Sequence, residues 1–236
     1  MMLQQTQVSR VIPAFESWIG RFPTVQSVAS ATRADCLLQW AGLGYNRRAK
    51  YLHDSCSEIA ATHNAIIPQE LDQLVALPGI GKNTASAIMA YSYNEPVVFI
   101  ETNIRTVFIH HFFSNVTAAV ADAQLMPLIQ QTVDAEHPRE WYWALMDYGS
   151  HLKKTVGNVN RISSHYTKQS KFDGSSRQIR GMVIALLRKE PHTLQSLEKH
   201  INDTRLSAVL DALESEGLVK KTGVEFRLSD YRSDIL

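Results

Sequence analysis

The chain has 236 residues, of which 44% are hydrophobic and 20% charged, as is typical of a soluble protein with one large or two modest domains. Its two cysteines, Cys36 and Cys56, exclude a disulfide framework, and no apolar run approaches the roughly 20 residues that a transmembrane helix needs. With a net charge of +1 and no signal-peptide pattern at its start, we expect a cytoplasmic protein without a membrane partner.

The first helices are predicted from apolar spacing and capping residues. Residues 1–22 are predicted to form a helix, bent near Pro13, because large apolar residues recur at helical spacing. These residues are Val8, Val11, Ile12, Phe15 and Ile19. Thr32-Arg-Ala-Asp35 predicts the start of a second helix, and Gly42-Leu-Gly44 its end. A basic helix follows, with Arg47 and Arg48 in its first turn.

The most informative stretch is Leu77-Pro-Gly-Ile-Gly-Lys-Asn-Thr-Ala85, which predicts a tight turn between two helices. Gly79 and Gly81 carry no Cβ, so the turn can bend sharply and another backbone can approach it closely. The amide groups at the start of the second helix would then favour an anion such as a DNA phosphate. Taken alone, the stretch is equally consistent with an ordinary helix-turn-helix connection that has a glycine cap.

A second polar stretch, Glu101-Thr-Asn103, follows the apolar run from Val97 to Ile100. Glu101 is expected at the start of a helix that continues to Phe113, where a carboxylate could simply be an N-cap. Two more helices are predicted between residues 121 and 152, the second of which carries Trp143.

The C-terminal region is predicted to be a separate small module. Asp173-Gly-Ser-Ser176 interrupts the helical pattern, and three amphipathic segments and an alternating hairpin around Thr222-Gly223 follow. Three helices followed by a hairpin are typical of a winged helix. Acidic residues on the third helix make a protein contact almost as plausible as DNA binding for this module.

Four motifs together resemble the helix-hairpin-helix (HhH-GPD) DNA glycosylases, in particular their MutY-like adenine glycosylase branch. The motifs are Met2-Leu-Gln-Gln-Thr-Gln-Val8, Trp40-Ala-Gly-Leu-Gly-Tyr45, Leu77-Pro-Gly-Ile-Gly81 and Glu101-Thr-Asn103. The resemblance covers roughly residues 1–152 and implies a mainly α glycosylase fold. We therefore expect three parts: a glycosylase domain at 1–152 that lacks the family's leading helix, a basic linker at 153–172, and a winged-helix-like α+β module at 173–236.

The resemblance also implies roles for single residues. Glu101 stands where the family has an Asp that stabilises the oxocarbenium-like sugar, and Asn103 stands beside it. Gln5 and Tyr45 match residues that fill the base stack when the target nucleotide leaves it. Contacts with the DNA backbone are expected from the hairpin and from basic residues near it. These residues are Arg47, Arg48, Pro78, Gly79, Gly81, Lys82, Lys153 and Lys154.

Several positions depart from the family pattern. Strand-cutting members have a lysine at the position of Asn83, whereas Lys82 lies one residue earlier, about 100° away around a helix, which predicts a glycosylase without lyase activity. Trp143 replaces a polar residue that contacts the base in the family. Asn83 and Trp143 are therefore the two positions expected to line the base pocket. The family's catalytic Glu falls one position before Met1, so we expect a reading frame that starts upstream and a chain that is inactive without it.

No iron–sulfur cluster or other metal is expected, because the four cysteines that a MutY supplies after Leu152 are absent. A monovalent cation could bind at the hairpin. The segment from Lys153 to Arg180 has a charge of +6 and could contact DNA phosphates in place of the cluster region, or be a solvated basic linker.

The sequence therefore predicts a monofunctional DNA glycosylase of base excision repair. Adenine opposite guanine or 8-oxoguanine is the favoured base, and thymine or uracil opposite guanine stays open. The alternative is a catalytically silent protein that binds distorted duplex DNA or recruits partners. We expect a monomer that binds mismatched or damaged double-stranded DNA, with a protein partner possible at the C-terminal module, associated with the nucleoid if the source is bacterial.

Overall fold

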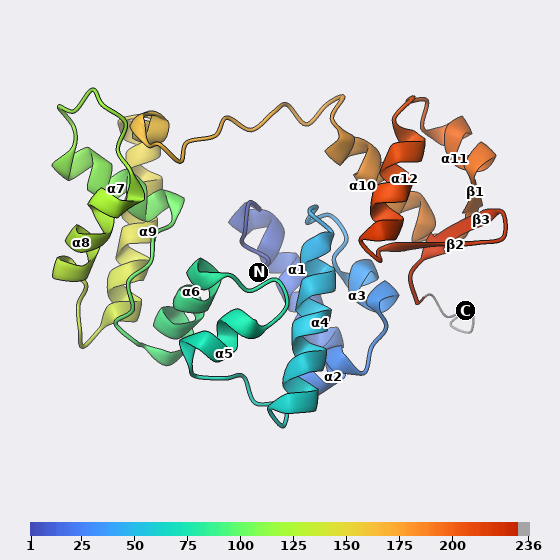
Figure 1. The fold of residues 1–236 in the computed structure, drawn as a ribbon, viewed down its shortest axis with the longest axis horizontal. Coiled ribbons are helices and arrows are strands. Elements are labelled where there is room, and N and C mark those ends of the chain that lie inside the picture. The colour runs from blue at the N-terminus through green and yellow to red at the C-terminus, as the bar shows by residue number, and fades with distance from the viewer. Residues whose placement is uncertain (231–236) are drawn as a thin grey trace. The chain divides into compact units, whose positions relative to one another are not determined.

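A computed structural model describes residues 1–230 of the chain, and these form two compact units (Figure 1). One unit consists of Met1–Ile67 together with the described residues from 170 to 230, and the other of Pro68–Gln169. The chain is mainly helical with one small sheet, as the sequence predicted. The predicted boundaries after residues 152 and 172 are not tested by this grouping and stay predictions. Within the described residues, no helix is long and apolar enough to cross a membrane.

The first unit combines the N-terminal helices with the C-terminal module. Its elements are α1 (Val8–Arg21), α2 (Val25–Ala29), α3 (Arg33–Gln39), α4 (Arg47–Thr62), α10 (Ser176–Leu187), β1 (His192–Thr193), α11 (Leu194–His200), α12 (Leu206–Ser215), β2 (Val219–Thr222) and β3 (Glu225–Leu228). The sheet has the order β1-β3-β2, with both pairs antiparallel and Gly223 at positive φ in the hairpin turn. Three helices and a hairpin thus follow one another as predicted for a winged helix.

The predicted helix from Met1 is wrong at its start, because α1 begins only at Val8. Residues 1–6 form turns, and the guanidinium of Arg48 donates to the carbonyls of Met1 and Met2, both at 2.9 Å, and of Gln4 at 2.5 Å. Carbonyl groups that would serve a helix are therefore bound by an arginine side chain.

The apolar period of α1 was predicted correctly, but the buried face is a different one. Val11 and Trp18 are buried, whereas the other four predicted core residues are 44–61% exposed. These four residues are Val8, Ile12, Phe15 and Ile19.

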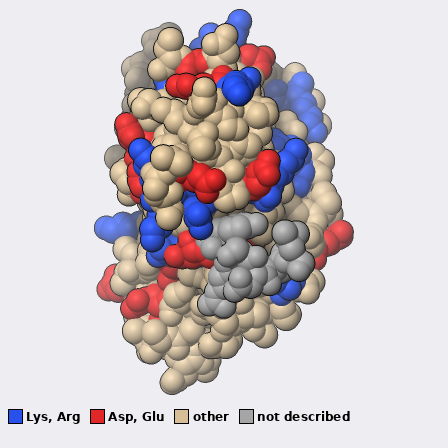
Figure 2. All heavy atoms as spheres, turned by 90° about the vertical axis from the view of Figure 1, so that its right-hand side faces the viewer, with Lys and Arg blue, Asp and Glu red and all other residues tan. Residues whose placement is uncertain are grey.

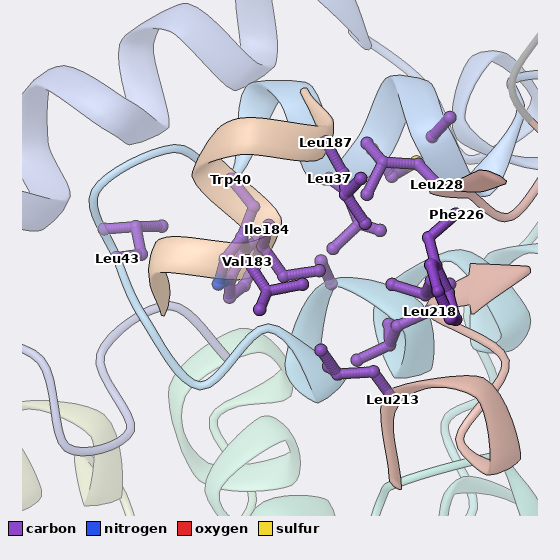
Figure 3. Close-up of a cluster of buried hydrophobic side chains, with 14 of the residues drawn as sticks. Leu37, Trp40, Leu43, Val183, Ile184, Leu187, Leu213, Leu218, Phe226 and Leu228 are labelled. Atoms are coloured by element: carbon purple, nitrogen blue, oxygen red, sulfur yellow. The ribbon is translucent and has the colours of Figure 1, made fainter. Parts of the chain in front are cut away.

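The core of the first unit joins α3 to the C-terminal module. Trp40 and Leu37, both fully buried, lie in one cluster with Val183, Ile184 and Leu187 of α10 (Figure 3). The start of α3 is fixed as predicted, by a capping box in which Thr32 and Asp35 bond each other's backbone amides. Residues about 140 positions apart in sequence therefore share one core.

The second unit contains α5 (Leu71–Ala76), α6 (Lys82–Tyr93), α7 (Thr102–Phe112), α8 (Asp122–Thr132), α9 (Pro138–Thr155) and the 3₁₀ helix η1 (Val159–Ile162). Helices α7 and α9 cross closely at Gly149, where an added Cβ would lie 2.2 Å from the carbonyl oxygen of Asn103. Only glycine allows this approach. After α9, buried Asn160 donates to Thr102 O at 3.1 Å and to Thr106 Oγ1 at 2.6 Å, which ties η1 back to α7.

Candidate DNA-binding and catalytic site

The predicted hairpin is the connection between α5 and α6. Gly79 has φ +73°, a conformation that favours glycine, and Gly81 is the N-cap of α6. A Cβ at Gly81 would meet nothing within 4 Å, and Gly79, Gly81 and Lys82 are exposed while Pro78 is half-buried. Gly81 is therefore exposed at the N-terminus of α6, and the positive end of a helix favours an anion.

The segment before Glu101 is neither helix nor strand. Backbone groups of three of its residues, Val97, Phe99 and Ile100, are bound by side chains. The hydroxyl of Tyr142, from α9, donates to Val97 O at 2.7 Å and accepts from the Phe99 amide at 3.4 Å. The Asn83 carboxamide, from α6, donates to Ile100 O at 2.6 Å and accepts from the Ile100 amide at 3.4 Å. Two helices thus fix the backbone that leads to Glu101.

Glu101 is the N-cap residue of α7, but its side chain makes no capping hydrogen bond. The alternative of a purely structural cap is therefore not favoured. The residue is half-buried, and burial raises the pKa of its carboxyl above the ordinary value of 4.5. Burial and the charge of Glu101 also raise the pKa of Tyr91, whose buried hydroxyl has no hydrogen-bond partner among the described residues. The carboxylate therefore lies in a partly desolvated environment.

Asn103 is the second residue of α7, and α9 holds its side chain. Its Nδ2 donates to Met146 O at 3.0 Å, and its Oδ1 accepts from Lys153 Nζ at 2.5 Å. Burial, together with the charge of Arg105, lowers the pKa of Lys153. Lys154 is exposed next to it, and Trp143, on the same helix, is 52% exposed. Lys153 is therefore engaged with a predicted site residue, whereas Lys154 faces solvent.

The two residues predicted to enter the base stack, Gln5 and Tyr45, both belong to the first unit. Both have positive φ, at 57° and 46°, and both are exposed at chain reversals. The indole Nε1 of Trp40 donates to Gly44 O at 3.0 Å, directly before Tyr45. The guanidinium of Arg48 lies 5.5 Å from the centre of the Tyr45 ring. Each side chain is therefore presented at the tip of a tight turn.

Comparison with known proteins identifies the family of the chain. A family model described as HhH-GPD superfamily base excision DNA repair protein matches residues 1–131. The adenine DNA glycosylase of Mycolicibacterium smegmatis is 32% identical over 94% of this chain and 82% of its own length. The chain belongs to the HhH-GPD superfamily of base excision DNA repair proteins.

Other HhH-GPD relatives match a smaller share of their own length. The adenine DNA glycosylase of Mycobacterium tuberculosis is 43% identical over 45% of this chain, and the match spans 35% of that protein. The adenine DNA glycosylase of Homo sapiens is 31% identical over 64% of this chain, and the match spans 28% of that protein. A solved thermostable thymine-DNA glycosylase has a TM-score of 0.56 at 17% identity, covering 70% of this chain and 80% of that one. An endonuclease III–DNA complex has a TM-score of 0.54 at 15% identity, covering 72% and 73%. At these identities the two structures show the HhH-GPD fold alone.

Two arginines that were predicted to contact DNA have partners within the protein. Arg48 is buried, and besides the N-terminal carbonyls it donates to Thr6 Oγ1 at 2.8 Å. The exposed Arg47 forms an ion pair with Glu216 of the C-terminal module. The geometry argues against a phosphate contact from Arg48, whose role in this HhH-GPD protein is to hold the N-terminal turns.

Residues 1–230 contain no group of three or more His, Cys, Asp or Glu side chains that could hold a metal ion. Both cysteines are free and buried, and burial raises the pKa of Cys36 to about 12 and of Cys56 to about 11. Two cysteines cannot supply the four thiolates of an iron–sulfur cluster. The predicted cation at the hairpin stays a prediction.

Sequence reasoning missed Tyr91 and Tyr142. Both lie in predicted helices, where periodicity does not show what a buried hydroxyl contacts. The signal that could have found Tyr142, whose hydroxyl bonds Val97 and Phe99, is the need of an irregular segment for hydrogen-bond partners.

Proposed function

We propose that the protein is a monofunctional DNA glycosylase that hydrolyses the N-glycosidic bond of a mispaired base. The observation that carries the proposal is the placement of Glu101. Its half-buried carboxylate stands at the start of α7, is not used as a helix cap, and follows a segment held by Asn83 and Tyr142. Adenine opposite guanine or 8-oxoguanine is the first candidate substrate, because relatives at 32–43% identity are named adenine DNA glycosylases.

In the proposed mechanism the hairpin amides at Gly79 and Gly81 bind a phosphate, and Gln5 and Tyr45 fill the stack that the target nucleotide leaves. The bond between C1′ of the sugar and the base nitrogen then breaks. The negative charge of Glu101 offsets the positive charge that develops on the sugar. A water adds its oxygen to C1′ and loses a proton, and the departing base takes up one. Because Glu101 has one methylene more than the family's Asp, its reach towards the sugar is the most demanding part of the proposal.

The absence of lyase chemistry follows from position 83. A Schiff base needs an amine, and the carboxamide of Asn83 is not one and is engaged with Ile100. Lys82, whose amine is available in principle, lies on the exposed first turn of α6 one residue earlier. We therefore infer that base release leaves an intact abasic strand.

The test is base release from a panel of labelled duplexes. Adenine opposite 8-oxoguanine, adenine opposite guanine, and thymine or uracil opposite guanine are compared with a fully paired duplex, with and without alkali after the reaction. We expect cleavage at the mispaired adenine only after alkali. Tight binding of mispaired DNA without release of any base would overturn the proposal in favour of a silent DNA-binding protein.

A further inference from the structure

Tyr45, which the proposed function places in the DNA stack, is bound by the C-terminal module. Arg177, in the first turn of α10, donates from Nη1 to the Tyr45 hydroxyl at 3.0 Å. Its other terminal nitrogen, Nη2, donates to Ser170 O at 2.6 Å and to Ser170 Oγ at 3.3 Å. The guanidinium of Arg177 is therefore held between Tyr45, 132 positions away in sequence, and Ser170.

The loop that carries Tyr45 needs such support. Gly42, Gly44 and Tyr45 all have positive φ, at 80°, 71° and 46°. Glycine adopts this conformation freely, but a tyrosine does so at an energetic cost and keeps it only where neighbouring groups hold it. The carbonyl of Gly44 accepts from Trp40 Nε1 at 3.0 Å and from Arg48 Nη2 at 3.2 Å. These bonds fix the backbone, and the bond from Arg177 reaches the far end of the ring.

The C-terminal module also packs against α3, the helix that precedes the Tyr45 loop, through a shared hydrophobic core. Trp40 and Leu37 pack among Val183, Ile184 and Leu187 of α10 (Figure 3), and Arg188 Nη2 donates to Leu37 O at 2.6 Å. Removing the module would expose the helix that leads into the Tyr45 loop.

A second polar link joins the module to the first turn of α4. The Glu216 carboxylate forms ion pairs with both Arg47 and Arg180. Burial alone would raise the pKa of Glu216, but the hydrogen bonds and charges of the two arginines lower it below its ordinary value. The charged groups of the link are therefore paired within the protein.

The exposed face of the module does not resemble a DNA reader. The third helix of a winged helix is the usual reading element, and the exposed residues of α12 include Asp211 and Glu214. In the space-filling view, acidic and basic groups are intermingled with uncharged surface (Figure 2). A DNA-binding face would instead gather positive charge.

From these observations we propose that the C-terminal module is a brace for the lesion-engaging loop, and that Arg177 is the positioning residue that fixes Tyr45. This inference rests on the proposed function, since it assigns the module a task in that function. The module is thus an integral part of the glycosylase and not an appended DNA reader.

The test is a double-mutant cycle between the two side chains. Arg177→Met removes the guanidinium and Tyr45→Phe removes only the hydroxyl. Affinity is measured for a duplex with an abasic-site analogue opposite 8-oxoguanine. We expect each single variant to weaken binding by roughly five- to tenfold, the effect of one lost hydrogen bond, and the double variant to be no weaker than either single one.

Salt dependence separates positioning from a direct phosphate contact. Lys171→Met is the matched control, because Lys171 is an exposed cation six residues before Arg177 and its replacement also removes one positive charge. If Arg177→Met lowers the slope of log affinity against log salt by about one, and its effect adds fully to that of Tyr45→Phe, then Arg177 binds phosphate and the brace is refuted.

Amide hydrogen exchange tests the brace without DNA, so its outcome is independent of the proposed function. Arg177→Met and Tyr45→Phe should both accelerate exchange in residues 41–46 while α3 stays protected. Unchanged exchange in that loop would overturn the inference even in a protein that releases adenine. Faster exchange in a protein that neither binds nor cleaves lesion DNA would support the brace and refute the proposed function.

Discussion

The carboxamide of Asn83 binds the backbone of Ile100 in both directions, donating to its carbonyl oxygen at 2.6 Å and accepting from its amide at 3.4 Å. Ile100 directly precedes Glu101. The helix that begins at the predicted phosphate-binding turn therefore also holds the backbone that presents the carboxylate. In the proposed mechanism, binding of the DNA strand and placement of Glu101 therefore both depend on one helix, α6.

Replacing Asn83 with Ala should weaken both the fold and the activity. The substitution leaves the amide and carbonyl of the buried Ile100 without their partner, which costs about 1–3 kcal/mol of unfolding free energy. Base release should slow because Glu101 loses its support. Urea unfolding and single-turnover rates measure the two effects, and Asn83→Asp, which keeps an acceptor but no donor, should retain part of the stability. Wild-type stability in Asn83→Ala would show that the pairing with Ile100 is not formed in solution.

A methyl group at Gly149 should separate α7 from α9. Because the new Cβ would lie 2.2 Å from the Asn103 carbonyl oxygen, and backbone cannot move as a side chain can, we expect a loss of about 1–3 kcal/mol or more. Gly181→Ala is the matched control: that glycine is exposed within α10 with nothing near its Cβ position, so alanine should add about 0.5–1 kcal/mol. Thermal unfolding distinguishes the pair. Equal melting temperatures for the two variants would contradict the close crossing.

The adjacent lysines 153 and 154 should behave differently. Lys153→Met removes the bond to Asn103 Oδ1 and should slow base release with little change in the salt dependence of DNA binding. Lys154→Met removes an exposed charge and, if it contacts phosphate, should lower the salt slope by about one without changing the rate at saturation. Fluorescence anisotropy and single-turnover kinetics provide the two readouts. The reverse pattern would make Lys153 a phosphate ligand, as the sequence had predicted.

Glu101→Gln should raise stability at neutral pH while it removes activity. Burial raises the pKa of Glu101 in the folded state, so the folded protein binds this proton more tightly than the unfolded chain. The stability that the protonated group contributes is therefore present below its ordinary pKa of 4.5 and is lost as the pH rises through the folded-state pKa. Glutamine does not ionise and avoids this loss.

The measurement is the melting temperature of wild type and Glu101→Gln over a pH series. The variant should be more stable at pH 7, and the difference should shrink as the pH falls below 4.5. A variant that is less stable at pH 7 would show that the carboxylate has a stabilising partner in solution.

The sequence predicted what depends on local pattern. The capping box of Thr32, the hairpin glycines and the β2–β3 turn are written in neighbouring residues, and the structure contains all three. It did not predict which face of α1 is buried, because periodicity defines a stripe but not its partner.

Arg48 shows a second limit of sequence reasoning. In sequence it is a cation at the start of a basic helix. In the structure it is buried and donates hydrogen bonds to the carbonyls of Met1 and Met2, more than 40 positions away. The bond between Arg177 and Tyr45 spans a still longer separation, and neither residue belongs to a motif that predicts it. Partners of this kind depend on the tertiary fold.

The most direct test is the rate of adenine release from an adenine–8-oxoguanine duplex under single-turnover conditions, for the wild-type protein and for Glu101→Gln. We predict base release by wild type, and a rate reduced by about 100-fold or more in the variant, with unchanged affinity for the duplex. Equal rates for the two proteins would contradict the role of Glu101, and with it the catalytic site described for this chain.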